Sequence, residues 1–242
     1  MWKIQNLKGL FPVKARAVGR SLLEYITNLC NLDRYSSLSW SQEGEDMILR
    51  RIFEGCETGF FVDVGAHHPS RFSNTKYFYL KGWSGVNIDC SPSFKKNFEA
   101  HRTRDVNVAI AVGKATGEVQ YFQFDESAVN STSPDFVEKL GGTGFFPRSN
   151  AKINQDTLAN ILNKFASYKA IDFMDIDVEG SDLDVLTSND WERFRPKIIV
   201  VEIGCESIVD VFDNPTYIYL KEKKYKLICG TVRSFFFRDM LN

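Results

Sequence analysis

Two acids and a glycine, placed where neighbouring apolar runs end, are the residues of this sequence best suited to holding a small ligand. Asp63 and Gly65 close the run that begins at Phe60, and Asp89 closes the next run, 24 residues after the glycine. A glycine lets a ligand approach the backbone, and an acid ~20 residues further on can accept hydrogen bonds from both hydroxyls of a ribose. This spacing predicts a site for an adenosine-like ligand.

The residues that follow Gly65 narrow the class of ligand. A dinucleotide site needs further glycines, so that backbone N–H groups can hold a pyrophosphate. Here Gly65 is followed by Ala66, two histidines and Pro69. We therefore expect a ligand without phosphates. S-adenosylmethionine fits, because it offers a ribose to Asp89 and positive charges to the acidic turn at Asp63.

A second acidic group lies further along the chain. At strand spacing Asp175, Asp177 and Glu179 share one face, and Glu202 closes the following apolar run. Neighbouring carboxylates repel one another unless something positive lies among them. The candidates are the sulfonium of the cofactor, a shared proton, and a divalent metal such as Mg²⁺ held by Asp177 and Glu202. The structural alternative is helix capping, in which Glu179 and Asp182 complement the next helix.

If the reaction removes a proton from a hydroxyl group, it requires a base or a metal, because the pKa of an alcohol lies far above neutrality. The candidate catalytic groups are Asp175, Asp177, Glu179 and His67. His67 and His68 follow the glycine turn directly, and adjacent side chains point in different directions, so at most one of them serves as a base. A polar lining of the loop is the alternative role for both histidines.

The elements that must position these residues alternate along the chain from residue 59 onward. Strands are predicted at 59–64, 86–89, 106–111, 119–124, 171–177, 197–203, 226–229 and 234–238, and helices at 46–53, 74–81, 93–100, 155–165, 183–188 and 216–223. Nearly continuous apolar runs closed by an acid are typical of strands buried on both faces of a parallel sheet. The pattern predicts an α/β, doubly wound, mostly parallel sheet.

Two connections depart from this alternation. Only four residues, 230–233, separate the last two predicted strands, which is too short for a parallel crossover and predicts an antiparallel strand near the C-terminus. Residues 141–150 are rich in glycine and turn formers. We interpret them as a mobile loop over the active face, with an inert surface loop as the alternative.

Composition limits the partners. The 242 residues carry 30 basic and 31 acidic side chains, a net charge of −1 that disfavours nucleic acid as a partner. Residues 1–40 hold six bases and two acids, so they predict a basic helical extension, either solvated or touching a membrane surface. The five widely spaced cysteines and the lack of ~18 consecutive apolar residues favour a reducing, cytoplasmic location.

The ordered combination of these motifs resembles the FkbM-type S-adenosylmethionine-dependent methyltransferases, within the Rossmann-like class. It is carried by SQEGED at 41–46, FVDVGAH at 61–67, GWSGVNID at 82–89, MDIDVEG at 174–180 and VE at 201–202. The resemblance covers about residues 41–240. It implies a methyltransferase domain at 41–242, a seven-stranded sheet, and O-methylation of a sugar or glycan precursor with a free hydroxyl.

The resemblance also implies which residues bind the cofactor. Asp63, Gly65 and Ala66 would line it, Asp89 would bind its ribose, and Val108 and Ala109 would flank its adenine. The predicted cofactor-binding set further includes Cys90 and Ser91, which follow Asp89, together with Gln42, Asp46 and Asp175.

Two other functions are compatible with the same residues. Asp175-Ile-Asp177 is an Asp-x-Asp pattern, which in a nucleotide-sugar glycosyltransferase holds a metal on a diphosphate. A non-catalytic module with the same fold is the third reading, and a homo-oligomer is compatible with all three. Binding of S-adenosylmethionine would discriminate the methyltransferase from both alternatives.

Overall fold

The computed structural model describes residues 35–241. The chain divides after Leu38 into two units, and the second, Ser39–Asn242, contains the helices and strands of the described part. The predicted basic extension lies outside the described residues except for residues 35–40, so its role stays a prediction. Across residues 35–241 no helix is long and apolar enough to cross a membrane.

A seven-stranded sheet forms the core, which confirms the predicted fold class. Its order is β3 (Val106–Ala109), β2 (Ser84–Asp89), β1 (Phe60–Val64), β7 (Phe173–Ile176), β8 (Ile198–Glu202), β10 (Ser234–Asp239) and β9 (Tyr225–Gly230). The first five strands run parallel, and β10 runs antiparallel to both β8 and β9. The direction of winding reverses between β1 and β7, where a doubly wound sheet opens a crevice for a ligand.

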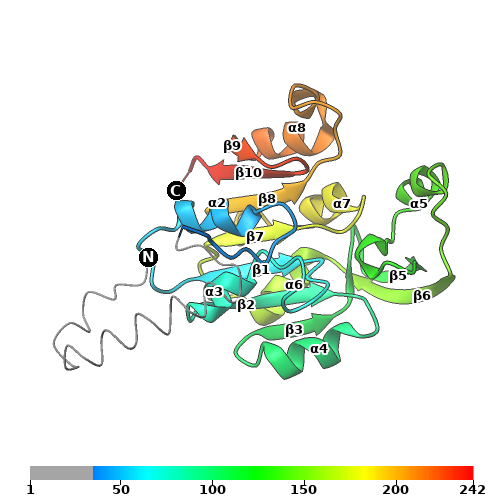
Figure 1. Ribbon diagram of the computed structural model, residues 1–242, viewed down its shortest axis with the longest axis horizontal. Helices are drawn as coiled ribbons and strands as arrows, with labels where there is room; N and C mark the ends of the chain where they lie inside the picture. Colours follow the sequence, from blue (N-terminus) through cyan, green and yellow to red (C-terminus); the bar gives the residue numbers. More distant parts are fainter. Residues whose placement is uncertain (1–34, 242) are drawn as a thin grey trace. The chain divides into compact units, whose positions relative to one another are not determined.

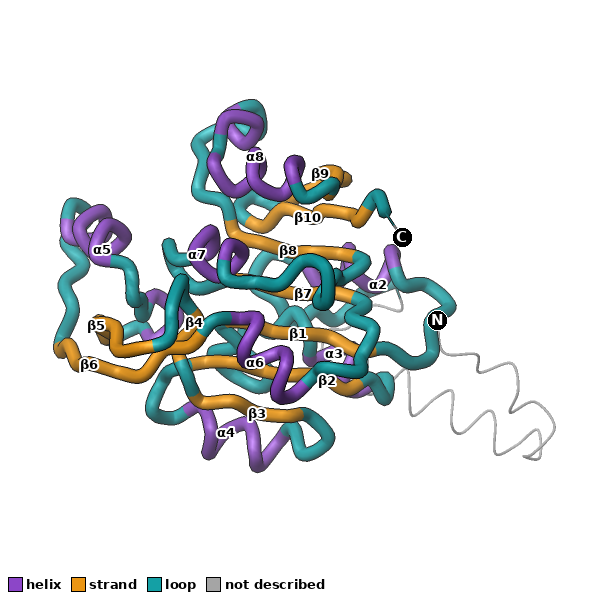
Figure 2. Tube along the Cα trace, turned by 180° about the vertical axis from the view of Figure 1, so that it is seen from behind, coloured by secondary structure: helices purple, strands orange, loops and turns teal. Residues whose placement is uncertain are grey.

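Helices cover both faces of this sheet. On one face lie α6 (Leu158–Phe165), α7 (Asp182–Thr187) and α8 (Pro215–Glu222), and on the other lie α2 (Glu45–Ile52) and α3 (Lys76–Leu80) (Figures 1 and 2). The helix α4 (Phe94–His101) packs beside β3.

The strand β1 shows why these runs are apolar throughout. Val62 and Val64 belong to the core on the α6 side, whereas Phe61 belongs to the aromatic core on the α2 side. Successive strand residues point to opposite faces, so a strand covered on both faces needs an apolar residue at nearly every position. Asp63 lies two residues after Phe61 and points to the same α2 side. It is the polar exception in this strand, so the apolar core on that side ends here.

A second, three-stranded sheet lies beyond the large one, and the sequence did not predict it. Its order is β4 (Ala111–Val112), β6 (Ser149–Asp156) and β5 (Gly117–Gln123). The helix α5 (Pro134–Gly141) and the short turns η2 (Ser127–Val129) and η3 (Asp210–Asp213) complete the elements. Figure 1 shows β5, β6 and α5 projecting from the large sheet; we call residues 113–156 the arm.

The arm corrects several predicted boundaries. The strand predicted at 106–111 breaks at Ile110 into β3 and β4, and the strand predicted at 119–124 belongs to the small sheet. The predicted loop 141–150 includes the end of α5 and the start of β6. The helix predicted from residue 155 begins at Leu158, because the Thr157 side chain accepts a hydrogen bond from the Asn160 N–H and caps it.

Candidate active site

A cleft opens where β1, β2 and β7 end. It contains about 570 Å³ of empty space, part of it open to solvent. Predicted site residues that line it are Gly65, His67, Asp89, Cys90, Ser91, Asp177 and Glu179. We call this space the first cleft.

Asp89 is held on the wall of the first cleft by its own neighbours. Its Oδ2 accepts a hydrogen bond from the His67 N–H at 2.9 Å, and its Oδ1 accepts one from the Ser91 N–H at 2.6 Å. Two atoms beside it, Ser91 Oγ and His67 Nδ1, are buried and lack a hydrogen-bond partner within the described chain. Buried polar atoms are seldom left unpaired, so their lack of a partner points to a polar ligand in this cleft.

Gly65 is needed for a reason that differs from the predicted one. Its φ is 87°, and a Cβ added there would lie 1.7 Å from the backbone oxygen of Asp177. The turn after β1 therefore passes directly against the turn after β7. Because Gly65 has no side chain, the backbone of Asp177 can pack directly against it, and this contact places Asp177 at the floor of the cleft.

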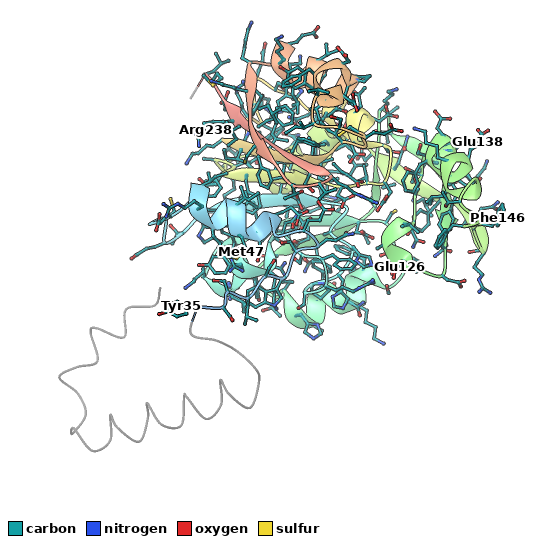
Figure 3. The ribbon with its side chains drawn as sticks, turned by 45° about the horizontal axis from the view of Figure 1, so that its top comes forward. Tyr35, Met47, Glu126, Glu138, Phe146 and Arg238 are labelled. Carbon is teal, nitrogen blue, oxygen red and sulfur yellow. The ribbon has the colours of Figure 1, made fainter. Side chains whose placement is uncertain are left out.

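The arm supplies the opposite wall of the first cleft through Ser127, Ala128, Asn130 and Thr132. Its contact with the β1 side is specific. His67 Nε2 lies 2.9 Å from Ser127 Oγ, and the Arg71 guanidinium donates to both oxygens of Glu126 at 2.9 and 2.8 Å. Figure 3 shows Glu126 on the side of the arm towards the large sheet, with Glu138 and Phe146 further out.

The two predicted histidines have different surroundings. Burial lowers the pKa of His67, so it is neutral at pH 7, and it faces the first cleft. His68 does not line the cleft. Its Nδ1 instead accepts hydrogen bonds from the N–H groups of Ser70 and Arg71 and so stabilises the turn at residues 68–71. Of the two, only His67 is placed to meet a ligand.

The adenine-side prediction is shifted by a few residues. Val108 and Ala109 lie on β3 and do not line the first cleft, whereas Ile110, Ala111 and Val112 do. Tyr121 of the arm lines the same part of the cleft beside Cys90, whose pKa burial raises to about 12. No pattern within one segment could reveal Tyr121, because it lies on β5 of the small sheet, whereas Cys90 follows β2 of the large sheet.

A second cleft meets the first at Asp177. It is lined by Gln42, Glu43, Glu45, Phe72, Asn74, Asp177, Glu202, Arg233 and Ser234. The start of α2 is tied to the β9–β10 hairpin across it, because Glu43 Oε2 accepts the Val232 and Arg233 N–H groups and Glu45 Oε1 accepts the Ser234 hydroxyl. Of the residues predicted from the 41–46 segment, Gln42 lines this second cleft.

The acidic cluster lies where the two clefts join. One carboxylate oxygen each from Asp177, Glu179 and Glu202 lies within 4.8 Å of the others. The prediction that Glu179 shares a strand face was wrong, because β7 ends at Ile176 and Glu179 adopts a left-handed φ of 52°. A turn, and not strand alternation, brings its carboxylate beside Asp177.

Electrostatics in the cluster favour a proton or a positive charge. Desolvation by the protein packed around it raises the pKa of Asp177, and so do the negative charges of Glu202 and Glu179, although the residue is exposed at the surface of the cleft. Burial and the Glu202 carboxylate raise the pKa of Glu179 to about 8. Arg233 Nη1, 3.7 Å from Glu202, is the nearest basic group that the structure pairs with this cluster.

Besides Val108 and Ala109, four predicted site residues lie outside both clefts. Asp63, Asp175 and Ala66 are buried behind the first cleft. Asp46 is fully buried and accepts hydrogen bonds from Ser39, Ser41, the Trp40 N–H and Arg50, so it anchors the segment before α2.

The positions of Asp175 and Asp177 do not support the interpretation of this Asp-x-Asp pattern as the metal site of a nucleotide-sugar glycosyltransferase. Asp175 is buried and both its oxygens accept hydrogen bonds from Asn74 Nδ2, whereas Asp177 faces the junction of the clefts. The two acids therefore do not present a joint ligand pair for a metal on a diphosphate.

The fold and the first cleft together define a class of protein. A doubly wound sheet with an antiparallel β10, a glycine turn after β1 and an acid at the end of β2 is the arrangement of Rossmann-like methyltransferases. Residues 63–227 match the family model described as the methyltransferase FkbM domain. The chain belongs to this family of S-adenosylmethionine-dependent methyltransferases.

Two solved structures align with the chain at low sequence identity. A TehB-like SAM-dependent methyltransferase from Corynebacterium glutamicum aligns with a TM-score of 0.42 at 10% identity, over 93% of this chain and 99% of that one. A putative O-methyltransferase from Klebsiella pneumoniae aligns with a TM-score of 0.44 at 9% identity, over 97% of this chain and 94% of that one. No curated protein matches the chain.

Proposed function

We propose that the protein transfers the methyl group of S-adenosylmethionine to a hydroxyl of a sugar or glycan precursor. The observation that supports this proposal best is the meeting of two clefts at Asp177. A transferase must bring a donor and an acceptor to one point, and most of its rate enhancement comes from that alignment. The first cleft is assigned to the donor and the second cleft to the acceptor.

The residues of the first cleft fit the cofactor. Asp89 presents a carboxylate whose position two backbone N–H groups fix, and Ser91 Oγ beside it lacks a protein partner within the described chain. These groups would bind the ribose. The acids at the junction of the clefts would favour the cationic end of the ligand. When bound, the cofactor supplies an electrophilic methyl group and leaves as a neutral thioether.

The residues of the second cleft suit a hydroxylated acceptor. Asn74 Oδ1 is buried and lacks a hydrogen-bond partner within residues 35–241, so it can accept a hydroxyl. Phe72 is 40% exposed at a left-handed φ of 56° and lines the same cleft. An exposed aromatic face among carboxylates and amides is the combination that contacts the C–H face and the hydroxyls of a sugar ring. The lining of the second cleft therefore supports a hydroxylated acceptor.

Asp177 is the residue assigned to proton removal. Its pKa is raised, and a positive charge beside a carboxylate lowers its pKa again, so the group ionises when a cationic ligand lies next to it. Asp177 would then accept the proton of the acceptor hydroxyl, and Glu179 and Glu202 would share the added proton. His67 is the alternative base, because it is neutral and faces the donor cleft.

Replacing Asp177 by Asn tests the proposal. We expect Asp177→Asn to abolish formation of S-adenosylhomocysteine with a panel of methyl glycosides and nucleotide sugars, while calorimetry finds the cofactor affinity within about threefold of wild type. Asp184→Asn, on the outer surface of α7, is the matched control and should keep full turnover. Full activity of Asp177→Asn would exclude it as the base.

Mg²⁺ is a separate proposal that the same cluster raises. Asp177 and Glu202 could share a divalent ion with Glu179, since their oxygens lie within 4.8 Å of one another. If the ion takes part, EDTA should stop turnover and added Mg²⁺ should restore it. Turnover that is unchanged in EDTA would assign the cluster to proton transfer alone.

A further inference from the structure

We propose that the tripeptide Ser73–Thr75, fixed by the buried side chain of Arg102, is the positioning device of the donor cleft. It holds the carboxylates of Asp63 and Asp175 directly beneath the cleft floor. This inference rests on the proposed function, because it assigns to these residues an effect on cofactor binding. None of them touches the space of the first cleft.

The two acids form a pair behind the cleft. Asp63 on β1 and Asp175 on β7 are in register, and their side chains are 3% and 6% exposed. Each lies two residues before a residue of the cleft floor, Gly65 and Asp177 respectively. The position of the pair therefore determines where the two turns of the floor meet.

One short segment holds both members of the pair. The Thr75 hydroxyl donates to Asp63 Oδ2 at 2.7 Å. Asn74 Nδ2 donates to the two oxygens of Asp175 at 3.1 and 2.9 Å. Successive residues of the tripeptide thus bind neighbouring strands, and a shift of the tripeptide would move both carboxylates.

Arg102 fixes the segment in turn. Its side chain is fully buried, and its Nη2 donates to Thr75 Oγ1 at 2.7 Å and to Ser73 Oγ at 3.0 Å. Its Nε donates to the carbonyl of Pro69 at 3.3 Å. The guanidinium holds residues 73 and 75, and Asn74 lies between them. A buried cation that bonds both ends of a loop leaves the loop one conformation.

Charge in this region has several sources. Asp63 faces Arg102 at the end of α4, Asp89 on β2, Asp105 before β3 and Asp175 on β7. Burial raises the pKa of Asp63 to about 6, and the Thr75 hydrogen bond and Arg102 counteract part of that rise. Loss of the Thr75 hydroxyl should therefore raise the pKa further. An ionised Asp63 favours a cationic ligand, so affinity should fall as pH decreases through that pKa.

The test compares Thr75→Val, which keeps the shape and removes the hydroxyl, with Thr75→Ser, which keeps the hydroxyl. Two quantities are measured from pH 5.5 to 8.5: S-adenosylmethionine affinity by calorimetry, and titration of the Asp63 carboxyl by ¹³C NMR. We expect Thr75→Val to lose about eightfold in affinity at pH 5.5, about twofold at pH 7 and almost nothing at pH 8.5, with the Asp63 midpoint about one unit higher. Thr75→Ser should behave like wild type.

Thr216→Val is the matched control, a buried threonine on α8, and should change neither quantity. A loss of affinity that is equal at every pH would show a merely structural role and overturn the proposal, as would an unmoved Asp63 midpoint. If the wild-type chain binds no S-adenosylmethionine while the Asp63 midpoint still moves, the proposed function fails and the role of the tripeptide in holding Asp63 stands. Thermal unfolding of each variant checks that it is folded at the assay temperature.

Discussion

Asp63 and Asp89 end neighbouring strands and were predicted to act together, yet their surroundings give them different roles. Asp63 is buried and accepts the Thr75 hydroxyl, whereas Asp89 lines the first cleft and accepts two backbone N–H groups. A carboxylate oxygen can accept more than one hydrogen bond, so Asp89 keeps capacity for a ligand. The two backbone N–H groups fix the position of the Asp89 carboxylate and leave lone pairs on both oxygens for a ligand.

Asp89→Ala is therefore expected to weaken S-adenosylmethionine binding by about 2–3 kcal/mol, the value for a hydrogen bond to a charged group. Titration calorimetry measures the change. Asp184→Ala changes a partly exposed acid on α7 that pairs with Lys114; it is the control and should bind as wild type does. An unchanged affinity of Asp89→Ala would contradict the ribose assignment.

At the scale of elements, the site depends on how closely the turns after β1 and β7 approach each other. Gly65 N donates to Ile88 O at 2.9 Å and Asp177 N donates to Val64 O at 2.9 Å, so these turns continue the hydrogen bonding of the strands. They leave no space for a side chain at residue 65. Asp177, the residue proposed as the base, is thus placed by backbone packing between two elements.

Gly65→Ala should destabilise the fold by roughly 2–5 kcal/mol, because it adds left-handed strain to a steric clash. Gly55→Ala is the matched control: Gly55 has the same φ of 87° and no atom within 4 Å of an added Cβ. Only the strain applies there, and we expect about 1 kcal/mol. Thermal denaturation compares the two, and equal losses would show that the contact with Asp177 is unimportant.

At the scale of the whole molecule, the crowded carboxylates make stability depend on pH in an unusual direction. The pKa of Asp182 is raised to about 7 and that of Glu179 to about 8, mainly by burial. A carboxyl whose pKa is higher in the folded state binds more protons there than in the unfolded chain. It therefore favours folding at low pH, and this contribution is lost as pH rises towards the folded pKa.

The ligand-free protein should accordingly lose stability between pH 6.5 and 8.5. The lowered pKa values of His67 and His68 act in the opposite sense, but only below about pH 6.5, where an unfolded histidine is charged. Thermal unfolding at several pH values measures the trend. Glu179→Gln should flatten it, and Glu118→Gln, exposed on β5, should not. Stability that increases over this range would contradict the assignment of raised pKa values.

Much of the fold and half of the site could be predicted from the sequence. The continuous apolar runs ending in Asp63, Asp89 and Glu202 predicted buried parallel strands, because only strands covered on both faces need that composition. Their acids fell at one edge, since the carboxyl ends of parallel strands meet there. The identity of the cofactor class and of the family followed from these local patterns.

The tertiary structure alone decided which of the acids can act. Asp175 belongs to the same motif as Asp177, and Asp46 to the same motif as Gln42, yet both acids are buried away from the clefts. Asn74 donates hydrogen bonds to Asp175, and Ser39 and Ser41 donate hydrogen bonds to Asp46. Those partners lie on other segments of the chain, so no local pattern encodes them. The spacing of residues in the sequence determines the position of a side chain on its own helix or strand, whereas the packing of elements that are distant in the sequence determines which groups that side chain contacts.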